Sequence, residues 1–90
     1  MGTDRLRLSP QVRFRAVDKE GVIIHTQRGV VIVVNSLGLR IMELIREHGC
    51  RQGVLDRLID EYDAPESILS TDLDDFLARL REQALVESIP

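Results

Sequence analysis

The sequence predicts an α+β domain in which a three-stranded antiparallel β-meander is followed by three helices. Short stretches rich in β-branched residues, separated by turn residues, occupy positions 12–35. Apolar residues at helical spacing occupy positions 37–84. Strands that precede helices, and do not alternate with them, indicate helices packed on one face of a sheet. With 90 residues we expect one domain over 1–90, with a flexible lead-in at 1–9.

Each expected strand has its own pattern. The three stretches are "VRFRAV" (12–17), "VIIHT" (22–26) and "RGVVIVVN" (28–35). The first alternates apolar residues with arginines, which is typical of a strand with one buried face. Turn residues in "DKEG" (18–21) and "QRG" (27–29) separate the stretches. Two short turns predict antiparallel neighbours with the second strand in the centre.

Three amphipathic helices are expected after the strands. They span about 37–48, 52–62 and 64–84. Asn35 or Ser36 can cap the first helix, and Gly49 can end it. Asp63 is the expected N-cap of the third helix, because Glu66 stands three residues later at the reciprocal capping position.

The sequence offers few signs of catalysis. It contains no HExxH, CxxC, Walker or GxSxG pattern, and His25, His48 and Cys50 lie in different elements. A single cysteine excludes an internal disulfide and fits a reducing cytoplasm. No apolar stretch reaches membrane-spanning length. We therefore expect a cytoplasmic protein that is not an enzyme, with no catalytic residue, metal site, cofactor or membrane attachment.

Three helices beside a small sheet resemble a winged helix-turn-helix, which makes DNA binding one alternative function. The third helix would then enter the groove of DNA. Its first half carries Glu66, Asp72, Asp74 and Asp75, and has no Lys or Arg before Arg79. With a net charge of −3, such a surface repels phosphates, so we expect no nucleic-acid partner. The three aspartates scatter around the helix, which favours a solvated surface over a metal site.

Residues 30–34 form an unusual strand for the edge of a sheet. All five are apolar and β-branched: Val30, Val31, Ile32, Val33 and Val34. They include no charge or proline, the devices that protect exposed edges. Three explanations stay open. The edge is covered within the domain or by a homodimer, or the sheet has a further strand, or the edge binds a peptide as an added strand.

A peptide that bound only to the edge would bind weakly. Four or five main-chain hydrogen bonds contribute ~0.5–1.5 kcal/mol each, while association costs at least ~4 kcal/mol. Micromolar binding needs about −8 kcal/mol, so two or three apolar side chains, at ~1.5–3 kcal/mol each, must be buried as well. The third helix is the natural second wall of such a site. Its apolar stripe includes Leu73, Phe76, Leu77 and Leu80, some of which must also hold the core.

Three segments of the chain resemble the PqqD-like peptide chaperones, which are also called RiPP recognition elements. These segments are "LSPQVRFRAV", "GVVIVVNSLGLRIMELI" and "LIDEYDAPESILSTDLDDFLARLREQALV". The resemblance implies a winged-helix-like fold that binds the leader of a ribosomal precursor peptide. The leader would add antiparallel to strand 30–34, against the third helix. The resemblance also implies a modifying enzyme as partner, either a radical-SAM protein or a leader peptidase. The ending "ALV" departs from the "GLL"-like ending common in the family.

The sequence therefore predicts a non-enzymatic protein that binds a leader peptide and presents it to a modifying enzyme. The expected peptide-binding residues are Val30, Val31, Ile32, Val33, Val34, Leu73, Phe76, Leu77, Leu80 and Arg81. Arg79 and Arg81 would pair with acidic leader residues. We expect Ile32→Pro to abolish binding by removing a donor from the ladder. DNA binding and structural homodimerisation are the alternative functions.

Overall fold

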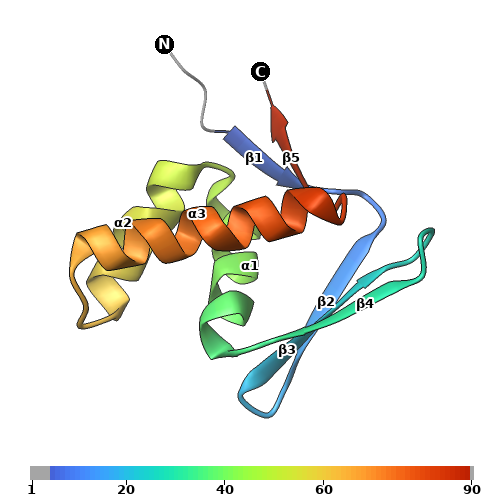
Figure 1. The fold of residues 1–90 in the computed structure, drawn as a ribbon, viewed down its shortest axis with the longest axis horizontal. Coiled ribbons are helices and arrows are strands. Elements are labelled where there is room, and N and C mark those ends of the chain that lie inside the picture. Colours follow the sequence, from blue (N-terminus) through green and yellow to red (C-terminus); the bar gives the residue numbers. More distant parts are fainter. Residues whose placement is uncertain (1–4, 90) are drawn as a thin grey trace.

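A computed structural model describes residues 5–89 of the chain. Its elements are β1 (Arg5–Leu8), β2 (Val12–Val17), β3 (Glu20–His25), β4 (Val30–Val34), α1 (Ser36–His48), α2 (Arg51–Glu61), α3 (Glu66–Glu82) and β5 (Val86–Ile89). The predicted fold class is confirmed, because β2, β3 and β4 form an antiparallel sheet in that order and three helices follow. Figure 1 shows this sheet at one end of the molecule, with the helices beside it.

Strands β1 and β5 form a second, two-stranded sheet that the sequence pattern did not predict. They pair antiparallel, with Leu8 opposite Val86. Figure 1 shows the two strands side by side, away from the larger sheet. The buried Leu6 anchors β1, and its backbone N–H donates to the carbonyl of Gly49 at 2.9 Å.

Part of the expected flexible lead-in, 1–9, is thus an ordered strand at residues 5–8. Positions 1–4 of that expectation lie outside the described residues. Local sequence patterns do not predict the pairing of β1, because its partner β5 lies about 80 residues later in the chain. The alternation of arginine and leucine in "RLRL" was the available signal for this strand.

Both turns of the meander use residues in the left-handed region. Asp18 has φ 56° and lies in the two-residue turn between β2 and β3. Because this turn is short, β3 begins at Glu20, two residues earlier than expected. Gly29 has φ 68° in the turn before β4, as its position at the end of "QRG" predicted.

The helix ends follow the sequence in two cases and depart from it in a third. Asn35 caps α1 with a 2.9 Å hydrogen bond, its side-chain oxygen accepting from the N–H of Gly38. Gly49 ends α1 in the left-handed region, as expected. The prediction for Asp63 is wrong, because the N-cap of α3 is Pro65 and no side chain caps that end. The extended backbone of Pro65 sets the entry to α3 instead.

A single cluster of buried residues joins the sheet to the helices. It includes Leu6, Ile23, Val34, Ile41, Met42, Leu44, Ile45, Val54, Leu55, Leu58, Leu69, Leu73, Leu77, Leu80, Leu85 and Val86. Val12 of β2 also belongs to the cluster, so every described helix and strand contributes at least one buried residue. The cluster fixes how α3 lies relative to the sheet, and so fixes the site described below.

Strand β4 alternates in burial although its sequence does not alternate in polarity. Val30, Ile32 and Val34 face the helices and are partly or fully buried. Val31 and Val33 face outward and are 62% and 60% exposed. On β3, Ile24 is the partner of Val31 and Val22 is the partner of Val33. The unbroken apolar run therefore reflects an edge strand that is apolar on both faces, and not a strand buried on all sides.

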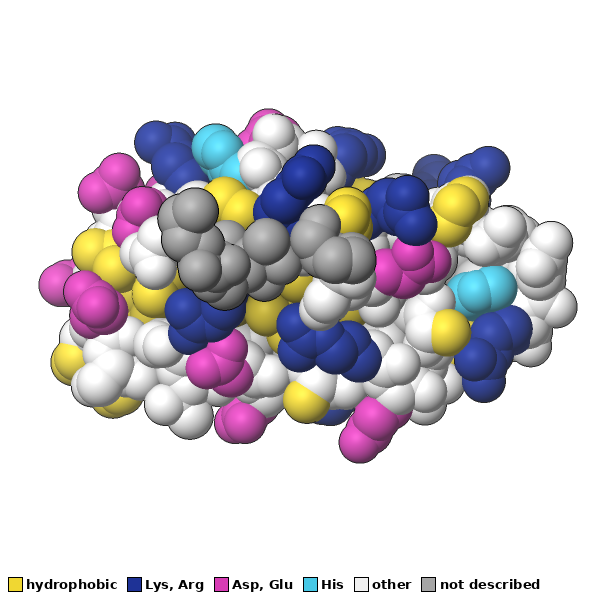
Figure 2. Space-filling view, turned by 90° about the horizontal axis from the view of Figure 1, so that it is seen from above, with side chains coloured by type: hydrophobic (Ala, Val, Ile, Leu, Met, Phe, Trp, Pro, Cys, Tyr) yellow, Lys and Arg dark blue, Asp and Glu magenta, His cyan; other side chains and the backbone are white. Residues whose placement is uncertain are grey.

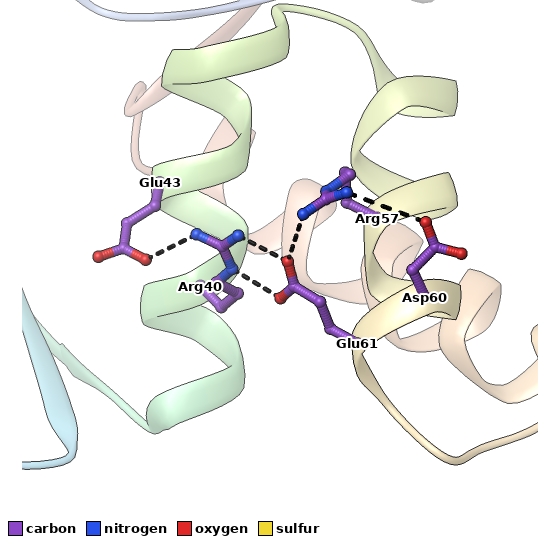
Figure 3. Close-up of polar contacts among 5 residues, drawn as sticks. All are labelled: Arg40, Glu43, Arg57, Asp60 and Glu61. Carbon is purple, nitrogen blue, oxygen red and sulfur yellow. Dashed lines mark hydrogen bonds and ion pairs between the residues drawn. The ribbon is translucent and has the colours of Figure 1, made fainter.

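An ion-pair network fastens α1 to α2 (Figure 3). The guanidinium of Arg40 donates two hydrogen bonds to the carboxylate of Glu61, at 2.7 and 2.6 Å, and Arg57 contacts the same carboxylate at 3.4 Å. The hydrogen bond from Arg40 holds the pKa of Glu61 below its ordinary value and raises the pKa of Arg40. Both side chains are about three-quarters buried, at 28% and 26% exposure.

We expect Glu61→Gln to lower the free energy of unfolding by about 1 kcal/mol at neutral pH, because it removes a bidentate ion pair. A lowered folded-state pKa contributes stability above the pKa of the unfolded state, and that contribution is lost as pH falls through the folded pKa. The gap between variant and parent should therefore close in acid. Denaturant titrations of both proteins at neutral and acidic pH measure this. Asp60→Asn, which alters an exposed 3.9 Å pair on the same helix, is the control expected to change little.

Candidate functional site

Two adjoining cavities lie between β4 and α3, and we call them together the β4–α3 groove. The larger has a volume of about 370 Å³ and is lined by Val33, Val34, Asn35, Leu37, Gly38, Ile41, Asp72, Asp75, Phe76 and Arg79. The smaller has a volume of about 220 Å³ and is lined by Ile32, Phe76, Arg79, Leu80, Glu82 and Gln83. Because both contain Phe76 and Arg79, these two residues mark the middle of the groove.

Helix α3 divides its side chains between two neighbouring faces. The core face carries Leu69, Leu73, Leu77 and Leu80, all of which are buried. The groove face carries Asp72, Phe76, Arg79 and Gln83, each one residue before or three after a core position. Residues three and four apart share one face of a helix, so both sets are continuous stripes. The groove wall of α3 therefore combines the half-buried Phe76 and Gln83 with the exposed, charged Asp72 and Arg79, and is not uniformly apolar.

A glycine lets α1 come close to the groove. A Cβ on Gly38 would lie 2.8 Å from the Cβ of Val34 and 3.2 Å from the ring of Phe76. The first of these distances is shorter than real Cβ atoms tolerate, and Val34 has no flexible end that could move away. The absence of a side chain at Gly38 thus allows β4, α1 and Phe76 to meet at the floor of the larger cavity.

The hydrogen-bonding direction of β4 can be traced from the other side of the sheet. Just past the end of β3, the N–H of Thr26 donates to the carbonyl of Gln11, and so points toward β2. Main-chain groups of successive residues point to opposite sides of an antiparallel strand. Ile23, three residues earlier, therefore points toward β4 and bonds with Ile32, its partner in the register.

The same alternation leaves two residues of β4 facing the open edge. Since Ile32 directs its N–H and C=O to β3, Val31 and Val33 direct theirs away from the sheet. Among the described residues no strand pairs with this edge, because β4 has β3 as its one neighbour. Each residue carries one donor and one acceptor, so the edge presents an alternating row of unpaired main-chain groups beside the β4–α3 groove.

The acidic residues of α3 have different surroundings. Asp74 receives hydrogen bonds from Arg51 of α2 at 2.7 and 3.1 Å, and this contact holds its pKa below the ordinary value. Asp72 and Asp75 line the larger cavity instead. All three aspartates are exposed, as the predicted solvated surface requires, but Asp74 also carries an interhelical ion pair and the other two also line the groove.

The structure brings together some of the predicted peptide-binding residues and separates others. Ile32, Val33, Val34, Phe76 and Leu80 line the groove. Val30 and Val31 belong to the same strand but line neither cavity.

The remaining three predicted residues lie outside the groove. Leu73 and Leu77 are 0% and 1% exposed and lie in the core, because the buried stripe of α3 is needed to hold the helix to the rest of the molecule. Arg81 lines neither cavity and donates to the hydroxyl of Ser88 in β5 at 3.1 Å. The sequence predicts that part of this apolar stripe holds the core without saying which part, and the structure places Leu73 and Leu77 there, with the groove face about one residue around the helix.

Several groove residues escaped the site predicted from the sequence. Asn35, Leu37, Gly38 and Ile41 come from the start of α1, for which the sequence predicts a cap and a buried face but no part in the site. Asp72, Asp75, Glu82 and Gln83 also line the groove, although the sequence predicts only a solvated surface for the two aspartates. The available signal was the spacing of Asp72, Phe76, Arg79 and Gln83, which places one aromatic and several polar residues on a single helical face.

Other kinds of site find little support in the described part of the chain. Between residues 5 and 89, no three His, Cys, Asp or Glu side chains are grouped so as to hold a metal ion. Figure 2 shows basic and acidic side chains interspersed on the face that carries β1 and β5, without a continuous basic patch. None of the described helices combines the length and apolar character needed to cross a membrane.

Comparisons with known proteins agree with this architecture. The chain is similar to the structure described as TbiB1 in complex with the TbiA(beta) leader peptide, with 28% sequence identity and a TM-score of 0.84. The alignment covers 93% of this chain and 98% of that chain. The structure of a lasso peptide synthetase B1 complexed with the leader peptide is 19% identical, with a TM-score of 0.79, covering 96% and 99%. No protein of curated function matches the sequence significantly. The family described as coenzyme PQQ synthesis protein D (PqqD) matches residues 20–86. Since that match spans most of the chain, the protein belongs to the PqqD family.

Proposed function

We propose that this protein binds the leader segment of a ribosomally made precursor peptide and presents it to a modifying enzyme. The leader would add to β4 as a fourth, antiparallel strand and lay alternate side chains into the β4–α3 groove. In this proposal the protein itself carries out no chemistry. A ribosomal peptide is made in the cytoplasm, so the proposed place of action is there.

The observation that carries the proposal is the open edge of β4 beside the groove. Val31 and Val33 offer main-chain donors and acceptors with no partner strand among the described residues. Peptides commonly bind to such edges, where main-chain bonds supply affinity and neighbouring pockets supply specificity. The complex of TbiB1, which is 28% identical over nearly the whole chain, contains a leader peptide and so supports the same role here.

The proposed binding residues differ from those predicted from the sequence. The main chain of Val31 and Val33 would form the ladder to the peptide. Ile32 and Phe76 would supply most of the apolar contacts, since both line the groove and are only partly buried, whereas Val34 and Leu80 line it but are 6% and 2% exposed. Leu73, Leu77 and Arg81 are left out of the proposed site, because they lie in the core or on the flank toward β5.

The partner enzyme is proposed at the level of its class. It would act on the precursor while the leader is held by this protein, either as a radical-SAM enzyme or as a leader peptidase. A peptide lying on β4 exposes every second side chain on the outer face of the sheet, next to Val31 and Val33. That surface remains accessible to an enzyme while the groove is filled.

A selection followed by NMR tests strand addition. A display library of short random peptides is selected on the immobilised protein, and one enriched peptide is titrated into isotope-labelled protein. Amide exchange at Val31 and Val33 should slow on binding, whereas Ile32, already bonded to β3, should change little. A library that yields no binder, or a bound peptide that protects another edge instead, would overturn the proposal.

The two alternative functions give different results. Nucleic-acid binding has no support from the groove face of α3, where Asp72, Asp75 and Glu82 outnumber Arg79. A structural homodimer formed through two β4 edges would protect Val31 and Val33 without any peptide. Sedimentation of the free protein reveals such a dimer, and its displacement by peptide would show that the same edge serves both.

A further inference from the structure

One charged residue stands at the centre of the groove and forms no ion pair with any residue in the described range 5–89. Arg79 lines both cavities, on the wall that faces β4. Within residues 5–89, Arg79 is the one Lys, Arg or His that lines either cavity. No carboxylate among the described residues lies within 4.0 Å of the Arg79 guanidinium, although Asp75 is four positions earlier and Glu82 three positions later.

The other arginines of the described helices already have partners, whether they are half-buried like Arg40 and Arg51 or exposed like Arg46. Arg40 is bound by Glu61 and Glu43, and Arg51 by Asp74. Arg46 lies over the ring of Phe14 at 4.7 Å. Arg79 therefore differs from these residues, because its donors are available to a ligand that enters the groove.

The register of β4 indicates which part of a peptide would meet Arg79. Val31 and Val33 bond to the peptide, so the peptide residue opposite Ile32 forms the non-hydrogen-bonded pair between them. Opposite residues of an antiparallel pair place their side chains on the same face of the sheet. That side chain therefore points, like Ile32, into the smaller cavity, which Arg79 also lines.

The neighbours of Arg79 restrict where a negative charge is tolerated. Asp72 and Asp75 lie toward the Val34 end of the groove, and Glu82 lies toward the opposite end. A carboxylate on the peptide would be repelled at either end and attracted only in the middle. The groove thus has a charge order of acidic, basic and acidic along α3.

From these contacts we infer that Arg79 selects a peptide with a carboxylate side chain at the groove-facing position opposite Ile32. The exposed guanidinium offers a planar fork of donors that fits an Asp or Glu side chain. This inference rests on the proposed function, because it assigns a sequence preference to the same peptide site. Arg79 would set specificity, while the edge of β4 and Phe76 would supply most of the affinity.

The test compares peptide selections on three proteins: the parent, Arg79→Glu and Arg15→Glu. Arg15 is exposed on β2, on the outer face of the sheet, and its reversal changes the net charge by the same amount. The parent and Arg15→Glu should enrich Asp or Glu at one position of the selected peptides. Arg79→Glu should lose that enrichment and favour Lys or Arg there instead.

Titrations with one enriched peptide give the magnitude. Replacing its acidic residue by the matching amide should weaken binding to the parent roughly five- to tenfold, but should strengthen binding to Arg79→Glu, where it removes a like-charge repulsion. A lysine at that position should restore binding to Arg79→Glu, a rescue that a merely structural role would not produce. Added salt should weaken the acidic peptide more than its amide form.

The outcomes separate this inference from the proposed function. If the library yields binders that protect Val31 and Val33 but carry no acidic preference, the role of Arg79 is refuted and peptide binding stands. An acidic preference that survives in Arg79→Glu refutes the inference equally. If no peptide is enriched by the folded parent, the proposed function itself fails.

Discussion

Val33→Pro is expected to keep its fold and to lose peptide binding. The N–H of Val33 points to the open edge of β4, so proline removes a donor that only a peptide would use. Proline is tolerated in edge strands when its nitrogen faces solvent, and the residue before it is already extended here. With the donor gone and the ring occupying the edge, we expect at least a thirtyfold or so loss of affinity, on the order of 2 kcal/mol. Calorimetric titration with an enriched peptide measures this loss.

Two further variants at the same edge isolate the cause. Val33→Thr keeps the N–H and the branched shape, so it should bind peptide nearly as well as the parent. Ile32→Pro, which the sequence alone favoured as the binding test, removes a bond between β4 and β3 and should destabilise the sheet instead. Circular dichroism and thermal unfolding distinguish these two effects. A folded Val33→Pro variant that binds with undiminished affinity would contradict strand addition on β4.

Phe76→Ala is expected to weaken peptide binding about tenfold to a hundredfold. The ring lies between the two cavities and packs against the core with one side, so a peptide side chain would bury the other side. Losing an apolar contact of this size costs about 1.5–3 kcal/mol. The same titration measures the change, and thermal unfolding reports the accompanying loss of stability.

The matched control for this variant lies on the same helix. Ile68 is 53% exposed and lines neither cavity, so Ile68→Ala removes apolar surface from α3 without touching the groove. Its peptide affinity should stay within about twofold of the parent. Equal losses in the two variants would mean that Phe76 acts through the stability of α3, and the groove would no longer be the binding surface.

The sequence correctly predicts two helix ends and single strands or helices, where the pattern involves residues close together in the chain. The caps at Asn35 and Gly49 were readable because capping depends on residues a few positions apart. The strand pattern of β2 and the helical stripe of α3 were readable for the same reason. The pair formed by β1 and β5 was not, since four-residue strands have weak patterns and these two meet only through the folded chain.

The sequence by itself determined the order of strands and helices, the apolar character of β4 and the acidic start of α3, because these depend on residue type and short-range spacing. Tertiary structure alone decided which face of α3 meets the groove. Leu73 and Leu77 are buried in the core, so the neighbouring face of the helix, with Phe76 and Arg79, lies toward β4. It also decided that Val31 and Val33, and not Ile32, carry the open main-chain groups. That direction is set by pairing with β3, a long-range register that no local pattern encodes.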